Sequence, residues 1–312
     1  MRIVIMGAGG LGGYFGARLA AAGNDVAFVA RGAHLAAIRK DGLRVTSARG
    51  DLHLRDVVAT DDPSTLAPAD VVIIGVKLWD TEAAAVAVKP LVRPGTAVVS
   101  FQNGVGKDDV LAGVLGREAI IGGVGQIGVV IASPGVIAHT GTMARLIFGE
   151  LDNRRSARVE ALLAACTAAG IDAEIATDIG LAIWEKFVFL VGMSGCTASM
   201  RSTIGPIRAN PQARGFLVDV VREAVAVGRA MGVPLPADFA EQRMGFIDTL
   251  PPQMTASMQG DLARGNRLEL PWLSGTVVEL GARVGVPTPF NRAVRDILTL
   301  YVDGAPAAAS PA

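Results

Sequence analysis

The sequence predicts an α/β N-terminal domain followed by an all-α C-terminal domain. Up to residue 178, short apolar runs typical of buried strands alternate with segments of helical periodicity. Beyond that point no strand–helix alternation is evident, and prolines separate a series of helical patterns. Regularly spaced glycines join the first strand to the first helix. We therefore expect domains at 1–178 and 179–304, with a disordered Ala/Pro-rich tail at 305–312.

The glycines after the first strand have the spacing of a dinucleotide-binding turn. Gly7, Gly9 and Gly12 form G-x-G-x-x-G between an apolar strand at 2–6 and a helical pattern at 14–22. This order is typical of a Rossmann-type domain, whereas the same glycines alone would fit a turn without a ligand. Gly7 permits the tight turn, Gly9 lets the backbone approach a pyrophosphate, and Gly12 lets the helix pack on the strand. We assign cofactor binding to six consecutive residues: Gly7, Ala8, Gly9, Gly10, Leu11 and Gly12.

The remaining elements follow from periodicity and from the turn residues between them. Strands are expected at 25–30, 43–45, 52–59, 70–76, 96–100, 119–131, 135–139, 144–149 and 171–175. Helices are expected at 33–41, 107–115 and 154–169, and in the second domain at 179–198, 216–231, 237–249, 255–264, 273–284 and 291–302. We expect 135–139 and 144–149 to be antiparallel partners, which makes His139 a turn residue rather than a catalyst.

Residues that follow the strands indicate the kind of cofactor. In such sheets ligands bind beyond the carboxyl ends of the strands. Arg31 follows the second strand at this edge, where a guanidinium suits a 2′-phosphate, whereas Asp25 lies at the opposite end. We therefore predict NADPH, although Arg31 could also be an ordinary exposed arginine. Lys77 ends the strand at 70–76 and could meet a phosphate or the substrate, or be solvated.

Composition excludes several classes of function. The 29 Lys and Arg residues balance 29 Asp and Glu residues, so nucleic acid and anionic membranes are not expected partners. No uncharged apolar run reaches the ~20 residues of a membrane span, and no signal peptide is evident before the first strand. Cys166 and Cys196 lack metal or redox spacing, and the three histidines are scattered. We expect a cytoplasmic protein without a metal site.

Reduction of a ketone by a hydride also needs a group that supplies a proton. Lys186 is a candidate because it lies in an otherwise apolar helical segment, where burial would lower its pKa, although it could merely extend to solvent beside Glu185. Glu269, two residues before a proline and expected at the end of a helix, could accept a substrate hydroxyl, pair with Lys186, or bind Arg264 or Arg267. A small substrate would lie where the two domains meet.

Several motifs together resemble the 2-dehydropantoate 2-reductases, also called ketopantoate reductases. They are GAGGLGGYFGARLAAAG at 7–23, Arg31, VKLWD at 76–80, FQNG at 101–104, HTGT at 139–142, IWEKF at 183–187 and SMQGDLARGNRLEL at 257–270. The resemblance implies NADPH-dependent reduction of 2-dehydropantoate to (R)-pantoate, a step of pantothenate synthesis.

The resemblance also implies residue roles. Lys186 matches the general acid, Glu269 the carboxylate that anchors the substrate hydroxyl, and Ser257 the serine near the substrate carboxylate. Asn103 matches the amide beside the nicotinamide and the catalytic lysine. Gly7, Gly9, Gly12, Arg31 and Lys77 match cofactor positions. From the residues alone, Asn103-Gly104 could be a simple turn and Ser257 a capping or exposed hydroxyl.

One departure from the family concerns the substrate. The family often has Asn four and eight residues after the lysine, where this chain has Leu190 and Ser194. We assign Ser194 to substrate binding, but leucine cannot hydrogen-bond a hydroxyl, so another 2-oxo acid is an alternative substrate. A dehydrogenase of β-hydroxy acids or polyol phosphates and a non-catalytic NADP-binding regulator are further alternatives. The apolar helical faces of the second domain make a homodimer plausible.

Overall fold

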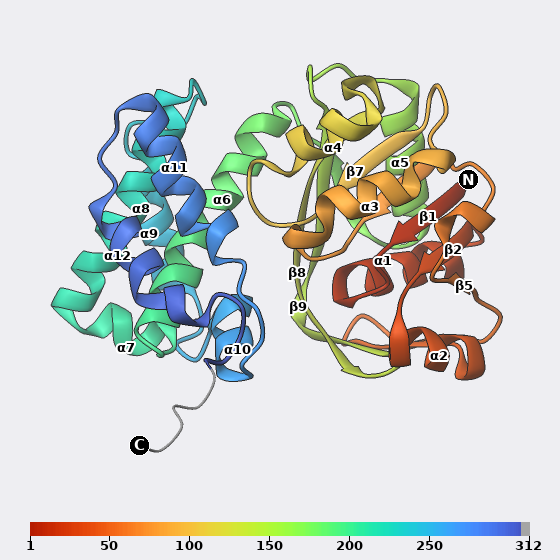
Figure 1. Cartoon of the computed structure of the whole chain (residues 1–312), viewed down its shortest axis with the longest axis horizontal. Helices are drawn as coiled ribbons and strands as arrows, with labels where there is room; N and C mark the ends of the chain where they lie inside the picture. Colours follow the sequence, from red (N-terminus) through yellow and green to blue (C-terminus); the bar gives the residue numbers. More distant parts are fainter. Residues whose placement is uncertain (307–312) are drawn as a thin grey trace. The chain divides into compact units, whose positions relative to one another are not determined.

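The computed structural model describes residues 1–306, and the chain forms two compact units (Figure 1). Unit 1 comprises Met1–Gln102 and Gly106–Ala182, and unit 2 comprises Asn103–Val105 and the residues from Ile183 onward. Unit 1 is an α/β structure and unit 2 is helical, which confirms the predicted fold class. Of the tail predicted at 305–312, residues 307–312 lie outside the described part of the chain.

Unit 1 is built on one sheet of ten strands. They are β1 (Arg2–Met6), β2 (Asp25–Val29), β3 (Leu43–Thr46), β4 (Leu52–Leu54), β5 (Val58–Thr60), β6 (Val71–Ile74), β7 (Ala97–Ser100), β8 (Ile120–Ser133), β9 (Val136–Glu150) and β10 (Asp172–Ile175). The strands β5, β2, β1, β6, β7 and β8 are neighbours in this order and all parallel. This is the order of a doubly wound dinucleotide-binding sheet, which reverses direction between β1 and β6.

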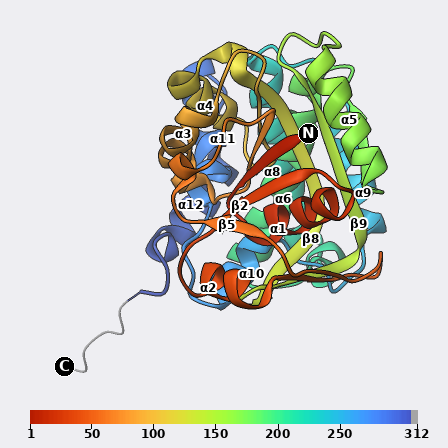
Figure 2. The ribbon, with the colours of Figure 1, turned by 90° about the vertical axis from the view of Figure 1, so that its right-hand side faces the viewer.

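Helices cover both faces of this sheet because alternate strand residues point to opposite faces. They are α1 (Gly10–Ala21), α2 (Gly32–Asp41), α3 (Thr81–Val88), α4 (Lys107–Leu115) and α5 (Ala157–Ala168). Ile3 and Ile5 of β1 belong to a buried core shared with α1, α2 and α5. Val4 and Met6 belong to a second core shared with α3 and α4. Figure 2 shows α3 and α4 on one side of the strands and α5 on the other.

The second half of the sheet differs from the prediction. The strands predicted at 135–139 and 144–149 are not partners of each other: residues 136–139 and 144–149 are parts of one strand, β9, which pairs antiparallel with β8. The register shifts between Ile127 and Gly128, which pair with Ala144 and Thr140, so residues 141–143 form a bulge in β9. His139 therefore lies within β9, and its prediction as a turn residue was wrong. The expected strand at 52–59 is also divided, because β4 pairs with β3 while β5 pairs with β2.

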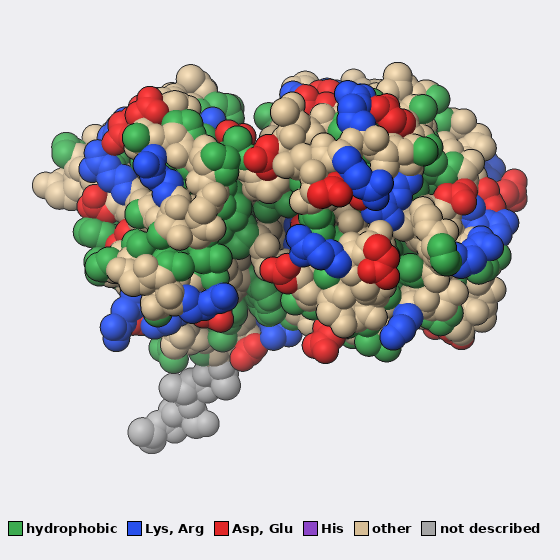
Figure 3. Space-filling model, turned by 90° about the horizontal axis from the view of Figure 1, so that it is seen from above, with side chains coloured by type: hydrophobic (Ala, Val, Ile, Leu, Met, Phe, Trp, Pro, Cys, Tyr) green, Lys and Arg blue, Asp and Glu red, His purple; other side chains and the backbone are tan. Residues whose placement is uncertain are grey.

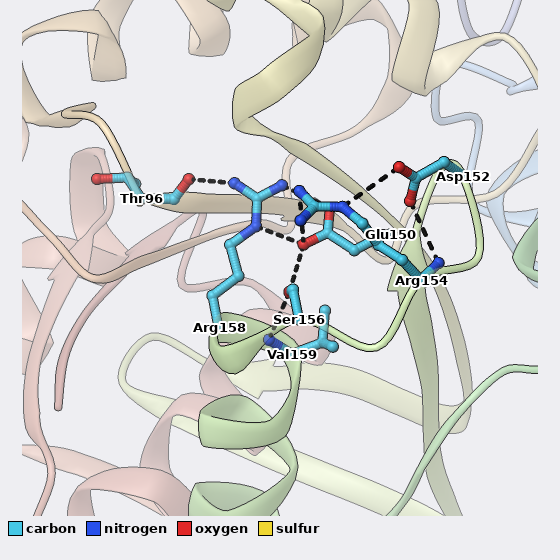
Figure 4. Close-up of polar contacts among 7 residues, drawn as sticks. All are labelled: Thr96, Glu150, Asp152, Arg154, Ser156, Arg158 and Val159. Atoms are coloured by element: carbon cyan, nitrogen blue, oxygen red, sulfur yellow. Dashed lines mark hydrogen bonds and ion pairs between the residues drawn. The ribbon is translucent and has the colours of Figure 1, made fainter.

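A buried carboxylate fixes the start of α5 against the end of β9. Arg158 donates to both oxygens of Glu150, at 2.7 and 2.6 Å, and to the carbonyl of Thr96 (Figure 4). Ser156 donates to the same carboxylate at 2.5 Å and accepts from the N–H of Val159 as the helix cap. Burial alone would raise the pKa of Glu150, but the hydrogen bonds from Arg158 and Ser156 outweigh it and hold that pKa below its ordinary value.

Unit 2 consists of helices joined by short loops, many of which contain proline or glycine. The helices are α6 (Ile179–Ser199), which begins in unit 1, α7 (Ile204–Ala209), α8 (Pro211–Ala230), α9 (Phe239–Thr249), α10 (Ser257–Ala263), α11 (Ser274–Val284) and α12 (Pro289–Leu298). The sequence analysis missed α7 and the first turn of α8, where Asn210 accepts from the N–H groups of Gln212 and Ala213. Glu223 accepts from the N–H groups of Phe290 and Asn291 and thereby fixes α12 to α8.

One described helix, α6, is long and apolar enough to cross a membrane by length and composition, and 61% of its apolar window is buried inside the structure. A mostly buried core helix also meets these criteria of length and composition, so α6 alone is weak evidence for a membrane span. On the face shown in Figure 3, acidic and basic side chains are interspersed rather than gathered by sign.

Candidate functional site

The glycine turn has the geometry that a dinucleotide-binding loop requires. Gly7 has φ +103°, and a Cβ there would lie 2.8 Å from the backbone nitrogen of Val76. A Cβ at Gly12 would lie 2.2 Å from the carbonyl oxygen of Gly7, so only glycine allows α1 to pack on β1. At Gly9 a Cβ would meet no described atom within 4 Å. The turn therefore leaves an open cradle beside the first N–H groups of α1, which fits a pyrophosphate.

Three contacts hold this loop in place. The N–H groups of Gly7 and Ala8 donate to the carbonyl of Val29, at 3.1 and 2.9 Å. His34 bridges the loop to the β8–β9 turn: Nδ1 accepts from the N–H of Gly135 at 3.0 Å, so Nε2 carries the hydrogen and donates to the carbonyl of Ala8 at 2.8 Å. Sequence reasoning missed His34, because its partners lie 26 and 101 residues away and no local pattern indicates them.

Arg31 follows β2 at the carboxyl edge of the sheet and is the N-cap residue of α2. Its side chain is 66% exposed, and Nη2 lies 3.8 Å from Oδ2 of Asp80. Such a long, exposed ion pair contributes little to stability. Asp25 is paired with Arg2 at 2.7 Å, at the other end of the same strand.

Lys77 precedes a short 3-10 turn, Leu78–Asp80, directly after β6. Its side chain is exposed, and Nζ lies 5.7 Å from the centre of the Trp79 ring. Since β1 and β6 are the strands between which the sheet order reverses, Lys77 and the glycine turn belong to adjacent strand ends.

Unit 2 brings together two predicted site residues that are 166 positions apart. The amide Nδ2 of Asn103 donates to Oε2 of Glu269 at 3.4 Å, and Glu269 is 8% exposed. Asn103 belongs to unit 2 although it follows β7, and Gly104 with φ +84° turns the chain after it. The backbone of Glu269 enters a 3-10 turn, Leu270–Trp272, rather than leaving a helix as expected.

The other predicted residues of unit 2 lie on two helices. Lys186 is partly buried on α6, with Leu190 and Ser194 one and two turns further along the same face. Ser194 is only 1% exposed, so little of its surface is open to a ligand. Ser257 is the exposed first residue of α10. Arg264 is paired with Asp261 at 2.9 Å, and Arg267 with Asp303 at 3.5 Å.

The two thiols are unsuited to chemistry at neutral pH. Cys166 and Cys196 are fully buried, and burial raises the pKa of each thiol to about 12. Among residues 1–306, no group of three or more His, Cys, Asp or Glu side chains could hold a metal ion.

Comparison with known proteins gives the family. The model described as "Ketopantoate reductase PanE/ApbA" matches residues 3–153, and its C-terminal counterpart matches residues 178–302. The chain belongs to the ketopantoate reductase family. A 2-dehydropantoate 2-reductase of Mesorhizobium japonicum is 33% identical over 315 residues, covering 94% of this chain and 95% of that protein.

Solved structures agree with this membership. A PanE/ApbA family ketopantoate reductase from Ralstonia eutropha has a TM-score of 0.88 and 33% identity, covering 97% of this chain and 98% of that one. A D-mandelate dehydrogenase with NADH and anilino(oxo)acetate reaches the same TM-score, 0.88, at 20% identity, covering 97% and 98%, and shares the fold. As a ketopantoate reductase family member, the chain is an NAD(P)-dependent oxidoreductase that acts on a small molecule.

Proposed function

We propose that this protein reduces a 2-oxo acid with NADPH, and that the substrate is 2-dehydropantoate, which gives (R)-pantoate. The observation that carries the proposal is the hydrogen bond between Asn103 and Glu269, in the same unit as Lys186. An amide and a buried carboxylate that meet from distant parts of the chain provide a donor and an acceptor for a hydroxylated 2-oxo acid. Relatives with the name 2-dehydropantoate 2-reductase support this substrate.

NADPH, when bound, supplies the hydride that reduces the ketone carbon. The cradle at Gly9 and the N–H groups at the start of α1 would hold its pyrophosphate. Arg31, at the end of β2, would hold its 2′-phosphate through charge-assisted hydrogen bonds, and Lys77 would add a second positive charge. We therefore propose NADPH rather than NADH as the preferred cofactor.

Lys186 would supply the proton. As the ketone carbon gains a hydride, negative charge develops on its oxygen, and the ammonium Nζ donates a proton to that oxygen. The place of Lys186 on α6, in the same unit as Asn103 and Glu269, and the match of IWEKF to the family motif support this role. Glu269 would accept from the substrate hydroxyl, while Asn103 orients Glu269 and Ser257 approaches the substrate carboxylate.

Leu190 supports an alternative substrate. One turn after Lys186, its apolar side chain cannot bind a hydroxyl, and Ser194 one turn further is almost fully buried. A 2-oxo acid with an apolar substituent is therefore the alternative, within the same reaction. We also propose that the enzyme is cytoplasmic.

The proposal is tested by following NADPH absorbance with purified protein and a panel of 2-oxo acids. The panel contains 2-dehydropantoate, a hydroxyl-free analogue of equal size, and an aromatic 2-oxo acid. Fastest turnover with 2-dehydropantoate supports the proposed substrate, and fastest turnover with an apolar member supports the alternative. If NADPH binds but no member of the panel is reduced, the proposal is wrong and a non-catalytic role is favoured.

A further inference from the structure

A cavity separate from the glycine turn lies beside the C-terminal half of α1. Its volume is about 140 Å³, well above the roughly 10–15 Å³ that one water needs. The walls include Tyr14, Phe15 and Arg18 of α1, Arg49 of the turn between β3 and β4, and Ile171 before β10. All of these residues belong to unit 1.

Two guanidinium groups line this cavity. Arg18 lies over the Tyr14 ring at 5.2 Å, and its Nη2 donates to the carbonyl of Gly50 at 2.5 Å. The Nε of Arg18 is buried and has no hydrogen-bond acceptor among the described residues. Nε of Arg49 donates to the carbonyl of Thr142 at 2.8 Å. Arg18 is half-buried and Arg49 is exposed, and among residues 1–306 neither forms an ion pair within 4.0 Å; the nearby carboxylate of Asp51 accepts from the N–H of Ser47.

The turn that carries Arg49 is connected to Tyr14, which lines the cavity, through Ser47 and His139. Ser47 accepts from the N–H of Arg49 at 3.1 Å and contacts Nδ1 of His139 at 2.8 Å. The ring of His139 in turn packs against Tyr14 with a centroid distance of 4.9 Å. The backbone of Arg49 is therefore linked, through Ser47 and His139, to the Tyr14 ring over which Arg18 lies, although the Arg49 side chain is exposed.

The chemistry of this cavity favours a small anion. Guanidinium groups present paired N–H donors that match the oxygens of phosphate, sulfate or carboxylate. Buried Phe15 and Ile171 bound the space with apolar surface, which restricts the ligand to a compact one. Residues 169–171, which follow α5, also line the cavity, and their N–H groups are used up by the carbonyls of residues 165–167.

We propose that Arg18 and Arg49 form a second binding site, for a compact oxyanion such as phosphate or a small dicarboxylate. Arg18 lies eight residues beyond the start of α1 at Gly10, a distance of about 12 Å along the helix. The cradle of the glycine turn is at that start, so a dinucleotide and the oxyanion could bind together.

Calorimetric titration of the NADP⁺-saturated protein tests this site, because the bound dinucleotide fills the phosphate-binding turn. Phosphate, sulfate and malonate are titrated separately at constant ionic strength, with chloride as the reference. We expect saturable binding of at least one oxyanion, weakened about tenfold or more in Arg49→Gln. Arg18→Lys keeps the charge but loses the paired donors, so it should also weaken binding.

Arg55→Gln is the matched control, since Arg55 is an exposed arginine of the same unit that does not line the cavity. Its oxyanion affinity should stay within about twofold of the wild type. The ligand with the lowest dissociation constant shows whether the site prefers phosphate, sulfate or a dicarboxylate. Absence of saturable binding, or equal affinities in wild type and Arg49→Gln, would overturn the proposal. The assay needs no turnover, so its result is independent of the proposed reductase activity.

Discussion

Substituting the central glycine of the phosphate-binding turn tests whether its open space is a cradle for the cofactor. Gly9 has φ −69° and ψ −161°, which alanine also adopts, and an added Cβ would meet no described atom within 4 Å. Gly9→Ala should therefore change the free energy of unfolding by no more than about 1 kcal/mol, the usual difference between glycine and alanine at an N-cap. A pyrophosphate in the cradle would collide with the new methyl group, so NADPH affinity should fall at least about tenfold, or ~1.4 kcal/mol.

Gly12→Ala should behave differently. Its Cβ would lie 2.2 Å from the oxygen of Gly7 and 2.8 Å from Cγ2 of Ile5, so α1 must shift away from β1. We expect a loss of about 1–3 kcal/mol in the free energy of unfolding, in addition to weaker NADPH binding.

Urea unfolding measures stability, and quenching of protein fluorescence measures the NADPH dissociation constant. Gly113→Ala on the exposed face of α4 is the control, since alanine is favoured inside a helix and no described atom lies within 4 Å of its Cβ. This control should keep its cofactor affinity. If Gly9→Ala also binds NADPH with wild-type affinity, the open space at Gly9 is not the pyrophosphate site.

Three further predictions concern other parts of the chain. Arg31→Ala should raise the dissociation constant of NADPH about tenfold or more while that of NADH changes little, and equal losses would remove the 2′-phosphate argument. His34→Ala should raise the KM for NADPH with little change in kcat, and His34→Gln should restore part of the wild-type KM. An unchanged KM in His34→Ala would show that the hydrogen bond to Ala8 does not position the loop. Glu150→Gln should lower the free energy of unfolding by about 3 kcal/mol at pH 7, because Arg158 loses its buried partner. The folded pKa of Glu150 is lowered, so the stabilisation by its carboxylate is present above the unfolded pKa near 4.5 and is lost as pH falls below it. The difference in the free energy of unfolding between wild type and variant, measured in urea, should therefore disappear in acid. A difference that stays constant with pH would contradict this assignment.

The sequence was most informative where a local pattern has one physical cause. Glycine at positions 7 and 12 is required by backbone contacts next to the turn itself, so spacing alone predicted that geometry. The buried strands around β1 were equally clear, because short apolar runs between helical segments are typical of strands that are covered on both faces. The same reasoning placed Arg31 after the second strand, where the structure has it.

Long-range pairing accounts for what the sequence did not reveal. Polar residues and Gly141 in the middle of β9 indicated a turn, but pairing with β8 resumes on both sides, at Thr140 and Ala144, and residues 141–143 form an unpaired bulge within one strand. Helix α3 was missed because its short Ala- and Val-rich run resembles neither a clear strand nor an amphipathic helix. The contacts of His34 with Ala8 and Gly135, and of Asn103 with Glu269, join residues far apart in sequence, and no local spacing indicates such pairs.

The most direct test of the proposed function is the rate of NADPH oxidation by Lys186→Ala with the best 2-oxo acid substrate. We expect kcat to fall by about 10²–10⁴, the usual contribution of a general acid, while the NADPH dissociation constant stays within about twofold. Glu185→Ala, the neighbouring substitution on α6, should retain most of the activity. Near-wild-type kcat in Lys186→Ala would contradict the assignment of Lys186 as the proton donor.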